Sequence, residues 1–109
     1  MPPDQQRMLQ RETLQGTIEM RIRHKGLRVL AEQDRAGQLP SHLVPKLRRV
    51  LTLLDQARHP GDLAQPGYRL HPLKGDRAGL WSIRVSGGWR VLFRFEDNEA
   101  VDVDLIDYH

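Results

Sequence analysis

The residues that could carry out chemistry lie in two short segments and at one position between them. Residues 70–77 contain a histidine and a lysine, the C-terminal segment 107–109 reads Asp-Tyr-His, and Arg90 lies between the two. Attack of a ribose 2′-hydroxyl on the adjacent phosphate needs a base, an acid and cations that stabilise the phosphorane. Histidine can serve as acid or base near neutral pH. Each residue alone fits an ordinary surface role, but together they suit RNA cleavage. The candidate catalytic residues are His71, Lys74, Arg90, Asp107, Tyr108 and His109.

Several familiar kinds of site are excluded by the residue types and their spacing. The sequence has no cysteine, which excludes disulfides, zinc–thiolate sites and thiol nucleophiles. Residues 75–79 lack the lysine and helix start of a phosphate-binding loop, and neither an H-x-x-x-H pair nor a G-x-S-x-G elbow is present. His71, Asp107 and His109 make only a weak set of metal ligands. We therefore expect no metal and no cofactor.

The composition is that of one small globular domain with a modest positive charge. The 109 residues include 17 Lys and Arg against 14 Asp and Glu, a formal net charge of +3. This charge gives a polyanionic partner a weak advantage over a merely well-solvated surface. No segment resembles a signal peptide or a membrane span, and with the lack of cysteine this predicts a cytoplasmic protein. Arginine suits forked contacts to phosphate, and the candidate RNA-binding residues are Arg77, Arg84 and Arg94.

These residues must be positioned by a strand, two helices and further strands. Alternation of Ile18, Met20 and Ile22 with charged residues predicts a first strand. A helical stripe from His24 is expected to end near Gly37. Ser41 is expected to cap a second helix that has Pro45 in its first turn and ends around Arg58. The apolar face of that helix is expected to comprise Leu43, Leu47, Val50, Leu51 and Leu54.

Four strands are expected in the second half of the chain, at residues 68–70, 80–85, 89–95 and 101–105. In the last of these, apolar residues at 101, 103 and 105 alternate with Asp102 and Asp104, and a hairpin at residues 97–99 precedes it. The order β-α-α-β-β-β-β predicts an α+β fold in which the helix pair covers one face of an antiparallel sheet. The other face is expected to be open.

The hairpin around residues 86–88 predicts an unusual pair of arginines. A three-residue loop would pair Val85 with Trp89 and Ile83 with Val91, which keeps the apolar residues on one face. The same register places Arg84 opposite Arg90 on the other face. Like charges in this arrangement cost stability unless both side chains extend into water or an anion lies between them.

Five segments together resemble the HigB branch of the RelE toxin superfamily. They are His24-Lys25-Gly26-Leu27, Leu70-His71-Pro72-Leu73-Lys74-Gly75-Asp76-Arg77, Trp81-Ser82-Ile83, Trp89-Arg90 and Asp107-Tyr108-His109. The resemblance covers residues 18–109 and implies a single RelE-like toxin domain, with residues 1–17 as a peripheral extension. It implies a toxin of a type II toxin–antitoxin system that enters the ribosomal A site and cuts mRNA there. It also implies a helix-turn-helix antitoxin of the HigA type as partner, and no membrane.

The resemblance also implies roles for the candidate residues. Lys74 and Arg90 would hold the scissile phosphate, while Asp107, His71 and His109 would share the acid and base work. Tyr108 would stack on a base. The alternative is a catalytically silent RNA- or partner-binding module that acts mainly as a co-repressor with its antitoxin. The histidines and the carboxylate favour the catalytic interpretation, because a pure binder would not need them around one phosphate.

Overall fold

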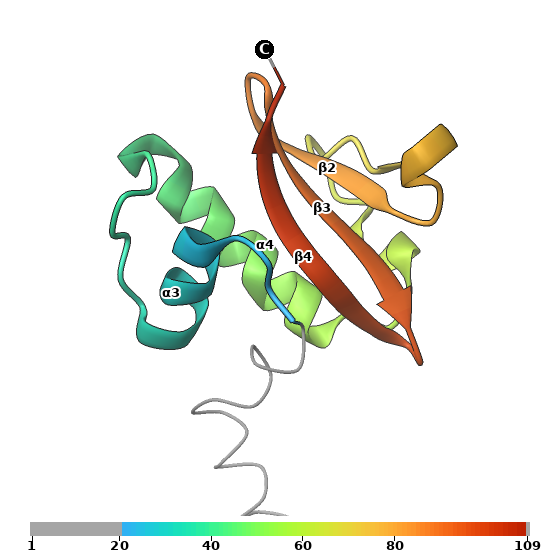
Figure 1. Ribbon diagram of the computed structural model, residues 1–109, viewed down its shortest axis with the longest axis horizontal. Coiled ribbons are helices and arrows are strands. Elements are labelled where there is room, and N and C mark those ends of the chain that lie inside the picture. Colours follow the sequence, from blue (N-terminus) through green and yellow to red (C-terminus); the bar gives the residue numbers. More distant parts are fainter. Residues whose placement is uncertain (1–20, 109) are drawn as a thin grey trace, which may run out of the picture.

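The computed structural model describes residues 21–108, in which two helices cover one face of a four-stranded antiparallel sheet. The helices are α3 (Lys25–Gln33) and α4 (Val44–Gln56), and the strands follow the order β1-β2-β3-β4 (Figure 1). This is the α+β architecture that the sequence predicts. The strands are β1 (His71–Pro72), β2 (Trp81–Ser86), β3 (Trp89–Glu96) and β4 (Glu99–Asp107), and the 3-10 turns are η2 (Ser41–Leu43), η3 (Pro60–Leu63) and η4 (Gly75–Arg77).

Some expectations concern residues outside this described part of the chain. They are the extension 1–17, the strand residues Ile18 and Met20, and His109. Of the expected first strand, the structure describes Ile22, which forms a single parallel bridge with Val103 of β4. The neighbouring N–H of Arg23 donates to the Val103 carbonyl at 2.6 Å. This bridge ties the segment before α3 to the last strand.

The helix ends differ from the expected ones for local reasons. His24 is the N-cap of α3, since its Nδ1 accepts a hydrogen bond from the Leu27 N–H at 3.1 Å. The helix ends at Gln33 and not near Gly37, since Asp34 adopts a left-handed conformation (φ 58°). The Asp34 N–H donates the last hydrogen bond of the helix to the Leu30 carbonyl. Ser41 does not cap the second helix: it begins the turn η2, and α4 follows from Val44. An extended residue, Ala57, ends α4 before Arg58.

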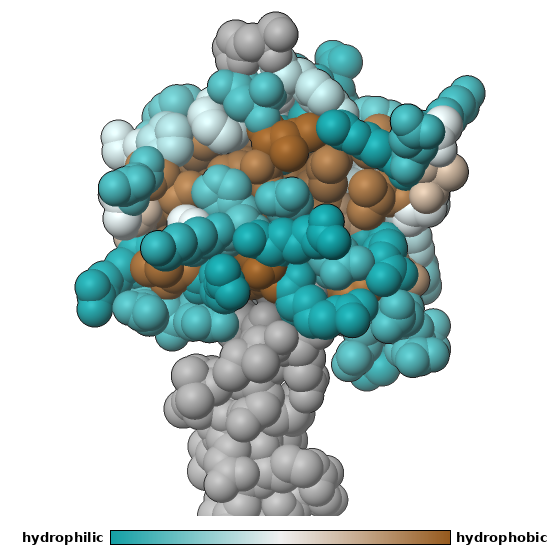
Figure 2. Space-filling model, in the orientation of Figure 1, coloured by the Kyte–Doolittle hydropathy of each residue, from teal (hydrophilic) through white to brown (hydrophobic). Residues whose placement is uncertain are grey.

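The core lies between the helices and the sheet. Leu47, on the predicted apolar face of the second helix, is fully buried, as is Phe93 of β3, and both join one apolar cluster with Val50, Ile83 and Val91. Each such side chain contributes on the order of 1.5–3 kcal/mol when removed from water. On the face shown in Figure 2, an apolar band runs across the middle between hydrophilic side chains. Among residues 21–108, no helix has the length and apolar character needed to span a membrane.

The first hairpin places the two arginines as predicted but turns more tightly. Ile83 pairs with Val91 and Arg84 pairs with Arg90. The expected pairing of Val85 with Trp89 is wrong: Ser86 pairs with Trp89, and a bulge at Val85 takes up the extra residue. The connection is therefore the two-residue turn at Gly87 and Gly88, with Gly87 at φ 54°. Glycine adopts this left-handed conformation without strain.

The second hairpin also has two turn residues. Asp97 and Asn98 both have positive φ, at 53° and 63°, so β4 already begins at Glu99. A register shift then follows, with Asp102 at φ 54°. Ala100 consequently pairs with Phe95 on the core side, while Val101 pairs with Arg94 on the opposite side. The simple alternation expected for residues 101–105 is wrong at its first position.

The expected strand at residues 68–70 is also wrong. Arg69 has φ 52°, which breaks an extended run, and β1 begins two residues later at His71. Tyr68 is buried in the core cluster, and its carbonyl accepts the N–H of Arg84 at 2.6 Å. Tyr68 therefore lies beside β2 without belonging to a strand.

Candidate active site on the outer face of the sheet

We call the face of the sheet that points away from the helices the outer face. Strand alternation places on it the side chains of Arg84 on β2, Arg90 on β3 and Ile106 on β4, which form one row across the sheet. A second row next to it contains His71, Ser82, Leu92 and Asp104. The outer face is only partly open, because Ser82 and Leu92 are buried. Leu80, which precedes β2, lines a cavity of about 220 Å³ together with Leu92.

Arg84 and Arg90 are directly opposite each other and half-buried. Within residues 21–108 neither of them forms an ion pair. One guanidinium nitrogen of Arg90, Nη1, donates to the carbonyls of Gly87 at 2.9 Å and Trp89 at 3.3 Å. The turn thus holds Arg90 by one nitrogen, and its remaining N–H groups are available to a ligand. Two paired arginines without a carboxylate suit an anion that bridges them.

His71 is held in a defined orientation on the same face. Its Nδ1 lies 3.1 Å from the carbonyl oxygen of Arg69. A carbonyl can only accept, so this contact is a hydrogen bond when Nδ1 carries the proton, which leaves a lone pair on Nε2. The left-handed conformation of Arg69 belongs to the bend that brings this carbonyl to the ring. The exposed His71 is therefore arranged to accept a proton at Nε2.

Lys74 lies in the connection between β1 and β2, where it directly precedes the turn η4. The Leu73 N–H donates to the Leu80 carbonyl at 2.8 Å, which closes the connection at its base. Gly75, the next residue, has φ 66° and nothing within 4 Å of where its Cβ would be. Its conformation favours glycine on backbone grounds alone. Lys74 is exposed at this bend, three residues after His71.

The C-terminal segment meets this connection through Tyr108. The Tyr108 N–H donates to the Gly88 carbonyl at 2.8 Å, which extends the pairing of β4 beyond Asp107. The Tyr108 hydroxyl accepts a hydrogen bond from Arg77 Nη1 at 2.6 Å, and the Arg77 guanidinium lies 5.8 Å from the ring centroid. Tyr108 is 44 % exposed. The structure thus brings together two predicted site residues that are 31 positions apart.

Asp107 is placed differently from its neighbour. Asp107 pairs with Trp89, whose side chain packs against the core. Strand alternation therefore directs the Cβ of Asp107 to the face of the sheet that the helices cover. Its Oδ1 lies 3.1 Å from the position that a Cβ on Gly88 would occupy. The carboxylate thus lies at the end of the sheet beside the turn at Gly87 and Gly88. By the same alternation, Arg90 and Tyr108 belong to the opposite, outer face. His109 lies outside the described residues.

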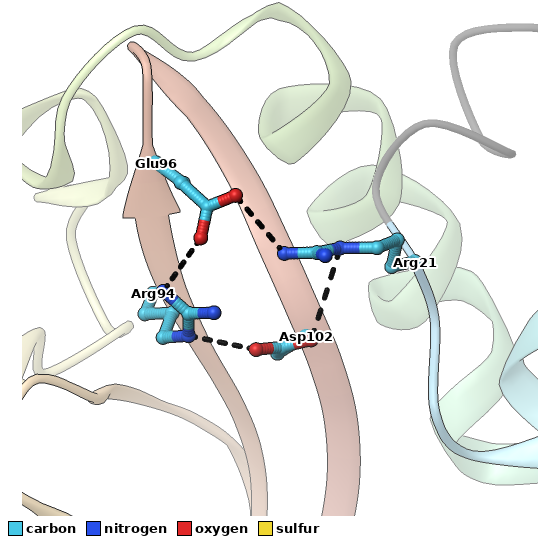
Figure 3. Close-up of polar contacts among 4 residues, drawn as sticks. All are labelled: Arg21, Arg94, Glu96 and Asp102. Carbon is cyan, nitrogen blue, oxygen red and sulfur yellow. Dashed lines mark hydrogen bonds and ion pairs between the residues drawn. The ribbon is translucent and has the colours of Figure 1, made fainter.

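Arg94 belongs to a network of ion pairs at the other end of β3 (Figure 3). Its Nε lies 2.7 Å from Asp102 and its Nη1 lies 3.1 Å from Glu96, while Arg21 contacts the same two carboxylates at 4.0 Å and 3.3 Å. The hydrogen bond that Arg94 donates to Asp102 is the main cause of the raised pKa of Arg94. Two cations and two anions make the network neutral overall. Arg94 therefore lies on the outer face too, but toward the other end of β3 from Arg90, and its charge is already paired.

Two features near the site had no signal in the sequence. Lys46 of α4 has its Nζ 5.0 Å from the centre of the Tyr68 ring, and its pKa is lowered by burial and then by the charges of Arg49 and Arg84. The positive charge of Arg84 thus acts on a lysine of α4. Ser82, between His71 and Leu92, is fully buried, and its hydroxyl has no hydrogen-bond partner within residues 21–108. Helix and strand periodicity could not reveal either feature, because both depend on contacts between distant segments.

Gly88 is a position where the chain has no room for a side chain. A Cβ there would collide with the Tyr108 carbonyl oxygen. We expect Gly88→Ala to lower the free energy of unfolding by about 1–3 kcal/mol, the usual cost of overpacking. Gly61→Ala is the control, since its Cβ would meet only the His59 ring at 3.2 Å and should change stability by less than about 0.5 kcal/mol. Urea unfolding measures both. Equal stabilities for the two variants would contradict this close packing of the C-terminal segment.

No group of three or more histidine, aspartate or glutamate side chains within the described part of the chain is arranged to hold a metal ion. The residues on the outer face can instead supply cations for an anion and a histidine nitrogen for proton transfer. The arrangement fits a site for a phosphodiester.

Comparisons with known proteins identify the chain's relatives. Residues 20–109 match the family model of the HigB-like toxin, described as the RelE-like toxin of type II toxin–antitoxin system HigB. The chain is 40 % identical over 88 residues to Endoribonuclease HigB of Proteus vulgaris, an alignment that covers 81 % of this chain and 96 % of that protein. It is 34 % identical over 90 residues to Toxin HigB-1 of Vibrio cholerae, which covers 81 % and 95 %. The chain therefore belongs to the HigB-like family of RelE-like toxins of type II toxin–antitoxin systems.

Proposed function

We propose that this toxin is an endoribonuclease that cuts mRNA in the ribosomal A site and thereby inhibits translation. The observation that carries the proposal is the pair of half-buried arginines, Arg84 and Arg90, on one face with His71. The relative from Proteus vulgaris bears the name of an endoribonuclease and supports the same chemistry. The site lies on the outer face of a small sheet, which suits a substrate that the ribosome holds in place.

In the proposed reaction, the ribose 2′-oxygen attacks the adjacent phosphorus while its proton passes to a base. The 5′-oxygen leaves and takes a proton from an acid, so the products are a 2′,3′-cyclic phosphate and a 5′-hydroxyl. Lys74 and Arg90 bind the scissile phosphate and offset the charge that develops on it. Nε2 of His71 is the base, because the Arg69 carbonyl oxygen 3.1 Å from Nδ1 favours the tautomer with the proton on Nδ1. Asp107 or His109 supplies the one proton that the leaving oxygen takes, and Tyr108 stacks on a base.

The family description supports a partner as well as a reaction. A toxin of a type II system is paired with an antitoxin, and we propose a HigA-type antitoxin with a helix-turn-helix. In this proposal the toxin acts in the cytoplasm, where it meets the ribosome and mRNA. A purely co-repressing role would leave the arginine pair and the oriented histidine without a use.

Cleavage with purified components tests the proposed function. The protein is mixed with the same mRNA, either free or bound to ribosomes stalled at a defined codon. We expect cuts within the A-site codon of the bound mRNA, with cyclic phosphate ends, and far fewer cuts in free mRNA. No cleavage under either condition would contradict the proposal, and equal cleavage of both would contradict the dependence on the ribosome.

The two arginines expected to bind RNA from β2 and β3 should differ in their effect on binding. Arg84 forms no ion pair within the described residues, whereas Arg94 is paired with Asp102 and Glu96. Removing one phosphate contact to single-stranded RNA flattens the plot of log affinity against log salt by about 0.7. We expect this change for Arg84→Ala and almost none for Arg94→Ala, which removes the same charge. A 2′-O-methyl oligonucleotide, which lacks the nucleophile, is the ligand for this titration. Equal slopes for the two variants would contradict the assignment.

A further inference from the structure

Arg77 and Tyr108 contact each other in two ways at once. The guanidinium donates a hydrogen bond to the phenol oxygen at 2.6 Å and also lies 5.8 Å from the centre of the ring. The first residue belongs to the turn η4 after Lys74, and the second follows β4. A hydrogen bond and a contact with the ring together restrict both the position and the rotation of the phenol.

The two partners differ in how firmly the backbone holds them. The Arg77 N–H donates to the Lys74 carbonyl at 3.3 Å, and the Arg77 carbonyl accepts the Leu80 N–H at 3.0 Å. Tyr108 lies beyond the last strand residue, and its N–H donates to Gly88. An exposed side chain at such a position loses rotamer freedom when it binds a ligand, unless another contact has already fixed it. Arg77 supplies that contact, and its own backbone is held by the two hydrogen bonds of the turn η4.

We propose that Arg77 is a positioning residue that fixes the ring of Tyr108, so that a nucleobase of single-stranded RNA next to the cleaved phosphate stacks on its exposed side. The proposal rests on the proposed function in one respect, namely that the bound molecule is RNA. Stacking is sequence-tolerant, since every base has an aromatic face. Arg77 on this view acts through Tyr108, and a direct contact between Arg77 and phosphate is the competing role. Lysine could not replace it, because a point charge lacks the planar fork that reaches the hydroxyl and the ring together.

The contact itself can be tested without any assay of activity. The chain has two tyrosines, and Tyr68 is buried in the core, so it serves as an internal control. In protein labelled with ¹³C-tyrosine, we expect Arg77→Ala to move the ring resonances of Tyr108 toward those of a free tyrosine and to leave those of Tyr68 unchanged. Arg35→Ala, which removes an exposed arginine after α3, should change neither ring. Unchanged Tyr108 resonances in Arg77→Ala would overturn the proposal, whether or not the protein cleaves RNA.

The consequence for RNA is tested by affinity for the 2′-O-methyl oligonucleotide in a double-mutant cycle. We expect Arg77→Ala to weaken binding at least ~5-fold, the lower end of what one stacked base contributes. Tyr108→Phe keeps the ring but removes the acceptor, and it should weaken binding in the same direction. The double variant should bind no worse than Arg77→Ala alone, because both changes release the same ring. Arg77→Lys should recover little of the loss.

The outcomes separate the competing roles of Arg77. If Arg77 binds phosphate directly, Tyr108→Phe leaves affinity unchanged, the effects add, and Arg77→Lys restores most of the binding; each of these results would overturn the positioning role. If the wild-type protein cleaves no RNA, the proposed function fails, but the tyrosine resonances still decide whether Arg77 holds the ring. If the resonances move and affinity does not, the contact exists and the stacking role is wrong.

Discussion

Arg90→Ala is expected to lower the rate of mRNA cleavage by about 100- to 1000-fold, equivalent to roughly 2.7–4 kcal/mol of transition-state stabilisation by one donor aimed at a developing negative charge. The reason is that Arg90 has N–H groups left after its contacts with Gly87 and Trp89, and faces Arg84 across the sheet. Lys74→Ala should act in the same direction. Cleavage of ribosome-bound mRNA under single-turnover conditions measures the loss.

Arg94→Ala is the matched control, since it removes the same side chain from the same strand four residues further on. Its guanidinium is paired with Asp102 and Glu96, so its loss should change cleavage by no more than a few-fold. Arg90→Lys retains a charge and shows whether a folding defect explains the alanine result. Thermal unfolding of each variant completes the comparison. Equal cleavage by Arg90→Ala and Arg94→Ala would contradict the role of Arg90.

The second large effect is expected for His71. His71→Asn keeps an N–H that can donate to the Arg69 carbonyl but removes the basic Nε2. We expect cleavage to fall by about 10²- to 10⁴-fold, the usual contribution of general acid–base catalysis. Cleavage of ribosome-bound mRNA under single-turnover conditions again measures the loss.

The tautomer behind this prediction is directly measurable. Long-range ¹H–¹⁵N spectra of the imidazole should show the proton of neutral His71 on Nδ1. A proton on Nε2 would remove His71 as the base, and cleavage by His71→Asn at the wild-type rate would remove it from catalysis altogether.

Apolar alternation was sufficient to predict the most informative part of the site. The register that keeps Ile83 and Val91 on the core side also places Arg84 opposite Arg90, and this pairing is confirmed. Such a prediction succeeds because a slip by one residue would turn the whole apolar set toward water. It does not depend on the turn, which is why the error at Val85 left the arginine pair intact.

The errors occur where the backbone conformation is local and unusual. Arg69 and Asp102 both adopt positive φ. Because neither residue is glycine, the residue types did not predict that the regular strand conformation is interrupted at these positions. The first ends the expected strand before His71. The second shifts β4 against β3, with the result that Asp102 meets Arg94. The contact between Arg77 and Tyr108 was equally hidden, because it depends on the path of the turn η4.

If the outer face of this sheet cuts mRNA on the ribosome, the cuts must depend on Arg90. This is tested by transcriptome-wide mapping of mRNA 5′ ends in bacteria that express either the wild-type protein or Arg90→Ala without antitoxin, at matched protein levels. We predict new 5′-hydroxyl ends inside coding sequences, in phase with the reading frame, for the wild type and almost none for the variant. Growth arrest by the wild-type protein without new ends, or equal numbers of in-frame ends from both proteins, would contradict the proposed cleavage.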